Sequence, residues 1–503
     1  MATSTNEHQA LDVNGKPYNR GLLMLTIIVG LFGTFLAGTM LATAYPTLMH
    51  DFDINASTVQ WLSTGFMLVT GIMIPITAWM MNRFSSKILY ITGMSLFFIG
   101  NIICFAASDF AMLLTGRIVS ALGGGILTPL GQSIAMSIFP PEKRGTVMGM
   151  IGLAIGVAPA IGPTLSGWII DSWNWRMIFG ITLPFIGLDL LLSFFFMKKV
   201  LQTSDVKLDV LSGILSIVGF GSLLYGTSEA GNKGWTSAVV IWSIIIGIIF
   251  IILFCWRQFK LETPFLDIRL LKDWHFTLPS LLGSIARITL VGVELVLPLY
   301  IQIVRGESAF HSGLMLLPGA LLMGLMSPLS GMLFDKLGAR TLSIAGLILL
   351  TLGTLNFTTL TTTTPIIEII VLYAVRIMGI SLVMMPSNTA SLNALPLEKM
   401  NDGTAINNTL RQTLGAIGTA IFTTVYSNIQ NAQMPSKHLL QSAPLQYKHD
   451  AITAALNGYH AAFFTAVLFG ILGLILAFSL EKNAGLVKKD INKAAKNTVK
   501  EAQ

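Results

Sequence analysis

Long apolar segments follow one another through almost the whole chain, and they limit its fold more than any other feature. Each is near the ~20 residues that a helix needs to cross a bilayer. Only 11% of the 503 residues are charged, against roughly 25% in a soluble globular protein. The segments are 22–44, 58–80, 88–107, 111–137, 145–169, 176–197, 210–227, 237–256, 276–304, 312–333, 341–359, 365–394, 404–427 and 459–480. They predict an all-α membrane protein with 14 transmembrane helices.

The basic residues are distributed unevenly between the two sides that these segments define. With both termini placed inside, the inner segments hold 22 Lys and Arg, whereas the outer loops hold 4. The positive-inside rule therefore predicts a multi-pass plasma-membrane protein with both termini in the cytoplasm. The polar start of the chain has no signal-peptide core.

The fifth apolar segment is rich in glycine and proline, which would interrupt a soluble helix. The residues concerned are Gly152, Gly156, Pro159, Gly162, Pro163 and Gly167. Positions 152, 156, 160, 163 and 167 share one helical face, and small residues on such a face let another helix approach closely in a membrane. The stretch is either a tightly packed structural helix or one that closes against a neighbour during transport. In the second case Gly156→Leu or Gly167→Leu would block one transport state.

An internal repeat divides the chain into two halves. Asn82 and Arg83, after the second segment, correspond to Asp335, Lys336 and the nearby Arg340 after the tenth. The predicted parts are a cytoplasmic N-terminus 1–21, a six-helix bundle 22–197, a linker 198–275 with two extra helices, a second six-helix bundle 276–480 and a basic cytoplasmic tail 481–503. Two such halves are typical of secondary transporters. The chain has no nucleotide-binding P-loop, which leaves an ion gradient as the energy source or transport without coupling.

Four blocks of sequence resemble the major facilitator superfamily. They are the two loop motifs, the region of Arg117, the glycine-rich helix with the Trp173–Phe179 stretch that follows it, and the stretch from Arg411 to Gly418. Together they are similar to the fourteen-spanner drug:proton antiporters, which include multidrug, lincomycin and quaternary-ammonium efflux pumps. The glycine-rich helix resembles the antiporter motif that the exporters of that family carry.

This resemblance implies a proton-coupled exporter of amphipathic or lipophilic small molecules that works by alternating access. It implies a bacterial plasma membrane, a small-molecule substrate, protons and lipid as partners, no nucleic acid and a monomer. No cofactor beyond the proton gradient is expected. Alternatives are export of an endogenous lipid, peptide or metabolite, or a channel or membrane-embedded enzyme. We do not expect an enzyme, because no cluster of His or Asp lies within the segments.

The chain departs from the family pattern at two acids. The first helix of the family often has an Asp where this chain has Ala37, and the first loop motif usually has an Asp where this chain has Asn82. The second motif keeps Asp335. The resemblance places each motif acid near the start of a helix in the other half, where the contact forms a gate. We call the gate at Asn82 the first gate and the gate at Asp335 the second gate, and we expect the second gate to be the stronger. Asn82→Asp would then strengthen inner closure.

Charged residues inside the segments are candidates for proton coupling, because a charge at mid-bilayer costs at least ~2.5 kcal/mol. Glu294 is the first candidate, with Arg287 seven residues earlier on the same helical face, about 10 Å along the axis. The alternative for this pair is a static polar contact. Asp189 is the second candidate, placed at a lateral opening or against the extra helix pair. Arg117 corresponds to a coupling arginine of the family, with a structural role as the alternative. For Arg376, its counterpart in the second half, the structural role is the first expectation.

The substrate surface is the least readable part of the sequence. Flexible Met and aromatic side chains suit promiscuous apolar ligands. The candidate wall residues are Phe32, Phe35, Trp61, Phe66 and Met67, although such residues in a membrane helix often face lipid or core. Segment 428–457 is the only long outer loop expected.

Overall fold

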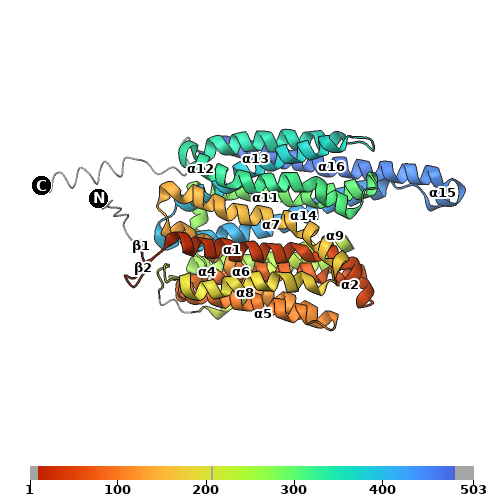
Figure 1. Cartoon of the computed structure of the whole chain (residues 1–503). Coiled ribbons are helices and arrows are strands. Elements are labelled where there is room, and N and C mark those ends of the chain that lie inside the picture. The colour runs from red at the N-terminus through yellow and green to blue at the C-terminus, as the bar shows by residue number, and fades with distance from the viewer. Residues whose placement is uncertain (1–9, 205–207, 482–503) are drawn as a thin grey trace, which may run out of the picture.

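The structure is a computed structural model that describes residues 10–204 and 208–481. Figure 1 shows a bundle of long helices lying side by side, with a short two-stranded sheet at one end and a helical projection at the other. Of the described helices, eleven are long and apolar enough to cross a membrane. The chain is therefore a multi-pass helical membrane protein.

The first part of the chain forms the sheet and the first helices. Its elements are β1 Ala10–Leu11, β2 Pro17–Tyr18, α1 Arg20–Thr39, η1 Met40–Ala44, α2 Tyr45–Asp51, α3 Ala56–Val59, α4 Trp61–Arg83, α5 Ser86–Phe105, α6 Phe110–Ile138, η2 Pro141–Lys143, α7 Arg144–Ser172 and α8 Arg176–Phe196. Strands β1 and β2 pair antiparallel, with Ala10 opposite Tyr18.

The extra pair and the second half follow. Their elements are α9 Val210–Lys233, α10 Ala238–Lys260, η3 Ile268–Lys272, α11 Trp274–Leu299, the π-helical turn η4 Tyr300–Val304, α12 Ala309–Leu355, η5 Asn356–Thr359, α13 Ile366–Asn393, η6 Leu397–Lys399, α14 Met400–Gln433, α15 Lys437–Ser442 and α16 Pro444–Phe478.

Helix α12 contains two of the segments that the sequence separates. Gly338, at φ 75° and ψ 172°, marks the bend between segments 312–333 and 341–359. A positive φ costs glycine little because glycine has no Cβ. The turn is so tight that no loop intervenes.

The expectation of a long loop at 428–457 is wrong. Helix α14 continues to Gln433, α15 follows, and α16 begins at Pro444. These helices form the projection beyond the bundle in Figure 1. Because the added turns are polar, hydropathy ends the segments where the apolar residues end, although the helices continue.

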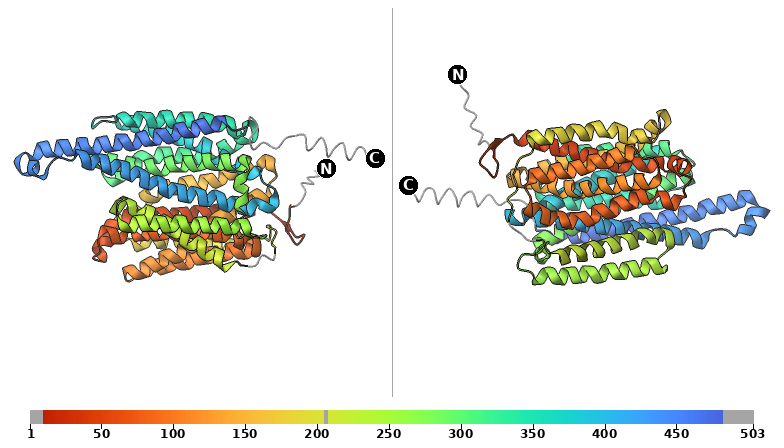
Figure 2. Two further views of the ribbon diagram at one scale, coloured as in Figure 1. Left: turned by 180° about the vertical axis from the view of Figure 1, so that it is seen from behind. Right: turned by 90° about the horizontal axis from the view of Figure 1, so that it is seen from below.

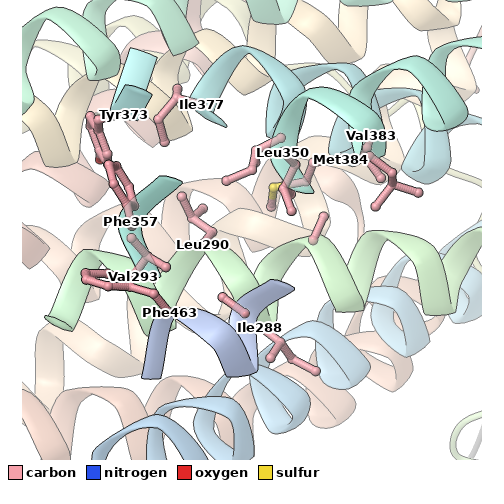
Figure 3. Packing of buried hydrophobic residues seen from close by; sticks show 14 of the residues in the cluster. Ile288, Leu290, Val293, Leu350, Phe357, Tyr373, Ile377, Val383, Met384 and Phe463 are labelled. Atoms are coloured by element: carbon pink, nitrogen blue, oxygen red, sulfur yellow. The ribbon is translucent and has the colours of Figure 1, made fainter. Parts of the chain in front are cut away.

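Two large apolar cores hold the bundle together. One lies among α11, α12, α13 and α16 and is shown in Figure 3, where Phe357, Tyr373 and Phe463 converge. The other lies among the first helices and also includes Leu392, Leu395, Met400, Ala405 and Ile406 from the ends of α13 and α14. That second core therefore joins the halves.

The halves meet along several helix contacts, which include those of α6 with α14 and of α7 with α13. Helix α7 packs against α12, and α4 packs against α14. Helices α9 and α10 pack on each other at one edge of the bundle (Figure 2), and α9 contacts both α4 and α14. The extra pair thus lies over the seam between the halves.

We call the end of the bundle that carries Asn82 and Asp335 the motif end. The last described residue, Glu481, lies there too, because its carboxylate is 2.9 Å from Nε2 of His275 near the start of α11. The described ends of the chain, β1 and Glu481, lie toward the same end of the molecule (Figure 1).

Candidate transport site

Glu294 lies on α11 with an exposed side chain, although its neighbour Val293 is completely buried. It interacts electrostatically with Arg287 and Arg376, which belong to α11 and α13. An exposed carboxylate that faces two arginines lies on an accessible surface inside the bundle rather than against lipid. Among the described residues it makes no direct ion pair with Arg287, so the static contact is not formed.

Arg376 and a further arginine of this half, Arg411, are almost completely buried. Arg376 donates through Nη2 to the backbone carbonyl of Thr289. Arg411, on α14, is 7% exposed and interacts electrostatically with Arg287. Its Nε and Nη2 have no hydrogen-bond partner among the described residues. Two guanidinium groups, of Arg287 and Arg376, therefore act on the Glu294 carboxylate, and Arg411 acts on Arg287. With three arginines and one acid, this polar region carries net positive charge.

Arg117 is buried in the first half at 1% exposure. Its Nε and Nη1 lie 3.4 and 3.3 Å from the carbonyl oxygens of Leu62 and Ala37, and its guanidinium lies over the Phe66 ring, 4.3 Å from the centroid. Ala37 is the position where the family often carries an acid. In this chain the arginine binds main-chain oxygen there, because no carboxylate is available.

Asp189 on α8 is completely buried. The Tyr90 hydroxyl on α5 donates to its Oδ2 at 2.9 Å, and Oδ1 has no partner among the described residues. Gly30 of α1 provides the space, because a Cβ there would lie 2.6 Å from Asp189 Oδ2. The expected location at a lateral opening or the extra pair is therefore wrong: the carboxyl group is enclosed between α1, α5 and α8.

The second loop motif closes against the start of α7. Asp335 accepts hydrogen bonds from the backbone N–H groups of Gly145 and Thr146, each at 3.1 Å, and from the Thr146 hydroxyl at 2.8 Å. An acid at a helix start satisfies free N–H groups and interacts favourably with the helix dipole. The carboxylate lies where the resemblance led us to expect it.

The first loop motif makes a neutral contact across the halves. The Asn82 side-chain oxygen accepts a hydrogen bond from Nδ2 of Asn401 at 2.8 Å, in the first turn of α14. Further along this interface, Asn408 on α14 donates to Gln132 on α6 at 2.8 Å. The remaining motif cations point outward: Arg83 and Lys336 are exposed, and Arg340 is half-buried.

Within the glycine-rich helix α7, two of the early glycines, Gly152 and Gly156, lie close to the other half. A Cβ at Gly152 would lie 2.7 Å from Sδ of Met385, and one at Gly156 would lie 2.8 Å from Cγ of Met323. At Gly162 a Cβ would collide with Thr39 of α1, within the same half. At Gly167 it would meet nothing within 4 Å. Gly167 therefore has no close neighbour in this conformation, and its role in another transport state stays a prediction. The side chains of Pro159 and Pro163 lie outside the described residues.

The proposed wall residues do not share one surface. Phe32 and Phe35 are half-buried on α1, and Phe66 lies beneath Arg117. Trp61 stacks on Tyr225 of α9, with ring centroids 5.8 Å apart. Met67 is exposed and lines a small hollow between α4, α9 and α14. Trp61 and Met67 therefore lie at the seam that the extra pair covers.

Sequence reasoning missed Tyr90, Asn401 and the Asn408–Gln132 contact. Each is a neutral polar residue within a helix, and its partner lies on a different helix. A buried polar residue in an apolar segment is a signal that a partner exists, but it does not identify that partner.

Comparison with known proteins agrees with this architecture. A model of the Major Facilitator Superfamily matches residues 27–419. The chain is 45% identical to the uncharacterized MFS-type transporter YcnB of Bacillus subtilis, over 93% of this chain and 97% of that protein. It is 41% identical to the lincomycin resistance protein LmrB of Listeria innocua, over 91% and 95%. The crystal structure of the human organic anion transporter MFSD10 has the same fold, with a TM-score of 0.65 at 15% identity over 91% and 99%.

Two halves that meet at a gate, with charged groups held inside the bundle, define a multi-pass membrane transporter. The chain belongs to the major facilitator superfamily.

The packing of α7 leads to a prediction with an internal control. Gly156→Leu should cut transport strongly, because its side chain must displace Met323 and separate α7 from α12; overpacking of this kind costs about 1–3 kcal/mol. Gly167→Leu should transport normally, since the space beside it is open. Transport rates of the two variants, corrected for the amount in the membrane, provide the test. Equal loss in both would contradict the packing argument.

Asp335→Asn should open the motif end and reduce transport. The amide cannot replace the charge at the start of α7, and an acid there is worth up to ~2 kcal/mol when partly buried. That loss would shift the balance of conformations about 30-fold. Labelling of a single cysteine placed between the halves at the motif end would measure the shift. Unchanged labelling would show that the contact does not hold the gate.

Proposed function

We propose that the protein is a proton-coupled exporter of amphipathic or lipophilic small molecules, working by alternating access in a bacterial plasma membrane. Relatives named for lincomycin resistance and multidrug transport support such substrates. We propose that the chain acts as a transporter and not as an enzyme. It would act as a monomer, with no cofactor and no nucleic-acid partner, and its partners are the substrate, protons and lipid.

The membrane topology of this proposal has 14 spans with both termini in the cytoplasm. The motif end is then the cytoplasmic end, and its contacts form the inner gate. The unequal distribution of Lys and Arg supports this orientation. Export requires that the inner gate open to load substrate and close before release outside.

The proposal of proton coupling rests on one observation, the exposed side chain of Glu294 within a spanning helix. It is a carboxylate within a spanning helix that is accessible in this conformation, so it can exchange a proton. It also faces Arg287 and Arg376 without being locked in an ion pair. Arg117 cannot release its proton. It would instead respond to nearby charge through its hydrogen bonds to main-chain oxygens.

Glu294→Gln should abolish accumulation of lincomycin driven by an imposed pH difference in proteoliposomes. The amide has the same shape and cannot titrate. Exchange of substrate without a gradient should remain, because alternating access itself is intact. As a second measurement, adding substrate to the purified wild-type protein should release protons, and adding it to Glu294→Gln should not.

The other intramembrane acid provides the contrast. Asp189 is enclosed, with one hydrogen bond from Tyr90 and no ion-pair partner among the described residues. If Glu294→Gln still accumulates substrate under a pH difference, Glu294 is not the proton site. Asp189→Asn is then the variant that should lose the coupling.

The excess of arginine supports a second candidate, export of an anionic endogenous metabolite. Arg411 has two donor nitrogens without partners, and a charge-assisted hydrogen bond to such a group is worth about 1.5–3 kcal/mol. Arg411→Gln should therefore weaken transport of decanoate by about tenfold or more and leave decylammonium unaffected. Equal transport of decanoate by both proteins would exclude this candidate.

A further inference from the structure

The chain that leads into the extra helix pair runs along the first gate. The backbone N–H of Ser204 donates to the carbonyl of Asn82 at 2.8 Å. The Ser86 hydroxyl donates to the carbonyl of Lys198 and accepts from the N–H of Val200, both at 2.9 Å. The first loop motif is therefore hydrogen-bonded to the linker before it reaches the other half.

The chain that leaves the pair is fixed to it by one buried side chain. Gln258 of α10 is completely buried. It accepts from the N–H of Phe265 at 2.7 Å and donates to the Ser212 hydroxyl of α9 at 2.7 Å. Phe265 and Leu266 are buried as well. The position of the next residue, Asp267, is consequently set by the extra pair.

Asp267 connects this linker to the second half. Its Oδ2 lies 2.6 Å from Nζ of Lys399, directly before α14, and the carboxylate side chain is only 8% exposed. Separating an ion pair that has one buried partner costs more free energy than separating a surface pair, because a charge is then left poorly solvated. It joins the extra pair to the helix whose start forms the first gate.

Asp402, in the first turn of α14, completes the cluster. It is 7% exposed and interacts favourably with Lys399, with the side-chain amide of Asn82 and with the backbone N–H of Asp267. The Asp267 carboxylate repels it, whereas Lys399 attracts both acids. In the second gate the acid belongs to the loop motif, as Asp335. In the first gate the loop carries Asn82, and the acid comes from the opposite half.

A hollow of ≈ 500 Å³ adjoins this cluster. Its wall includes Asn82, Glu262, Glu398, Lys399 and Asp402. Because water can enter a space of this size, it can solvate these charged side chains when their contacts break. The contacts are thus able to break and reform in a transport cycle.

We propose that the linker of the extra helix pair is a working part of the inner gate. Asp267 positions Lys399 and Asp402, and Asp402 replaces the acid that the first loop motif lacks at Asn82. The extra pair thereby favours the conformation in which the motif end is closed. The proposal rests on alternating access as stated under the proposed function and is independent of proton coupling.

This arrangement reverses the expectation for Asn82→Asp. A carboxylate at position 82 would face Asp402 and repel it, so the substitution should open the motif end. Combined with Asp402→Asn, it should restore closure, because one acid would again face one amide. The sequence-based expectation, in which Asn82→Asp strengthens closure, required a first gate without an acid.

Charge exchange at Asp267 and Lys399 tests the proposal directly. The background is the full chain with Cys104→Ala and Cys255→Ser, and the reporter is Ala405→Cys, a completely buried position in the core that joins the halves. Asp267→Lys and Lys399→Asp should each raise the rate of maleimide labelling about tenfold. The double exchange should return the rate to within about twofold of the parent.

Two controls separate gate opening from damage to the protein. Lys233 and Glu229 form an ion pair at 2.8 Å within α9 that does not cross the halves, so Glu229→Gln should leave labelling unchanged, whereas Asp267→Asn should raise it. A second reporter, Ala462→Cys, is buried in the other core and should react only if the protein unfolds.

Three results would overturn the proposal. They are single exchanges that label at the parental rate, a double exchange that labels as fast as the singles, and acceleration at Ala462→Cys equal to that at Ala405→Cys. Because labelling needs neither substrate nor a proton gradient, it gives the same answer whether or not the protein couples transport to protons.

Discussion

The hydrocarbon core of a bilayer provides no hydrogen-bond partners, and the arrangement of this protein depends on that fact. A polar group within the spans is stabilised only by a partner in the protein or by an accessible internal surface. Arg117 binds main-chain oxygens of Ala37 and Leu62, and Asp189 accepts from Tyr90. Glu294 has an exposed side chain in this conformation, whereas Asp189 is completely buried. In this conformation Glu294 can therefore exchange a proton, whereas Asp189 can do so only after the neighbouring helices separate.

The contact between the halves combines two kinds of interaction. Glycines of α7 bring its backbone against Met323 and Met385, which is apolar packing without hydrogen bonds. At the motif end the contact is polar, through Asp335 at the start of α7 and Asn82 at the start of α14. Packing of small residues allows the helices to slide or separate without leaving large cavities. The polar contacts hold the closed conformation at a few positions only, and water can replace these hydrogen bonds when the motif end opens.

The two gates are related by the internal repeat but do not have the same chemistry. In one, a loop acid binds free N–H groups of a helix start. In the other, the helix start itself carries the acid, and the loop provides an amide. The extra helix pair contacts both α4 and α14, so it lies where it can stabilise the weaker of the two gates. The two repeats therefore share the position of the gate. They differ in whether the acidic residue belongs to the loop motif or to the helix start of the opposite half.

Local pattern was sufficient to place the helices. The starts of α4 to α13 lie within a few residues of the apolar segments, because hydropathy and helical period depend only on neighbouring residues. The same reasoning failed at α16, whose first turns are polar, and at Gly338, where a single residue turns the chain. The count of 14 spans remains a prediction, since eleven described helices meet the criteria of length and apolarity.

The sequence by itself determined the class of the protein: a helical membrane transporter with two related halves and an extra pair, carrying acids and arginines at identifiable depths. Tertiary structure decided which group each of these meets. Asn82 and its partner Asn401 are 319 residues apart, and Tyr90 and Asp189 are 99 apart. Glu294 and Arg287 share a helical face yet form no direct ion pair, and Gly167 shares a face with Gly156 yet faces open space. Spacing along a helix fixes the direction of a side chain within that helix, whereas its partner depends on how neighbouring helices are rotated and crossed, and only packing of the whole chain sets that.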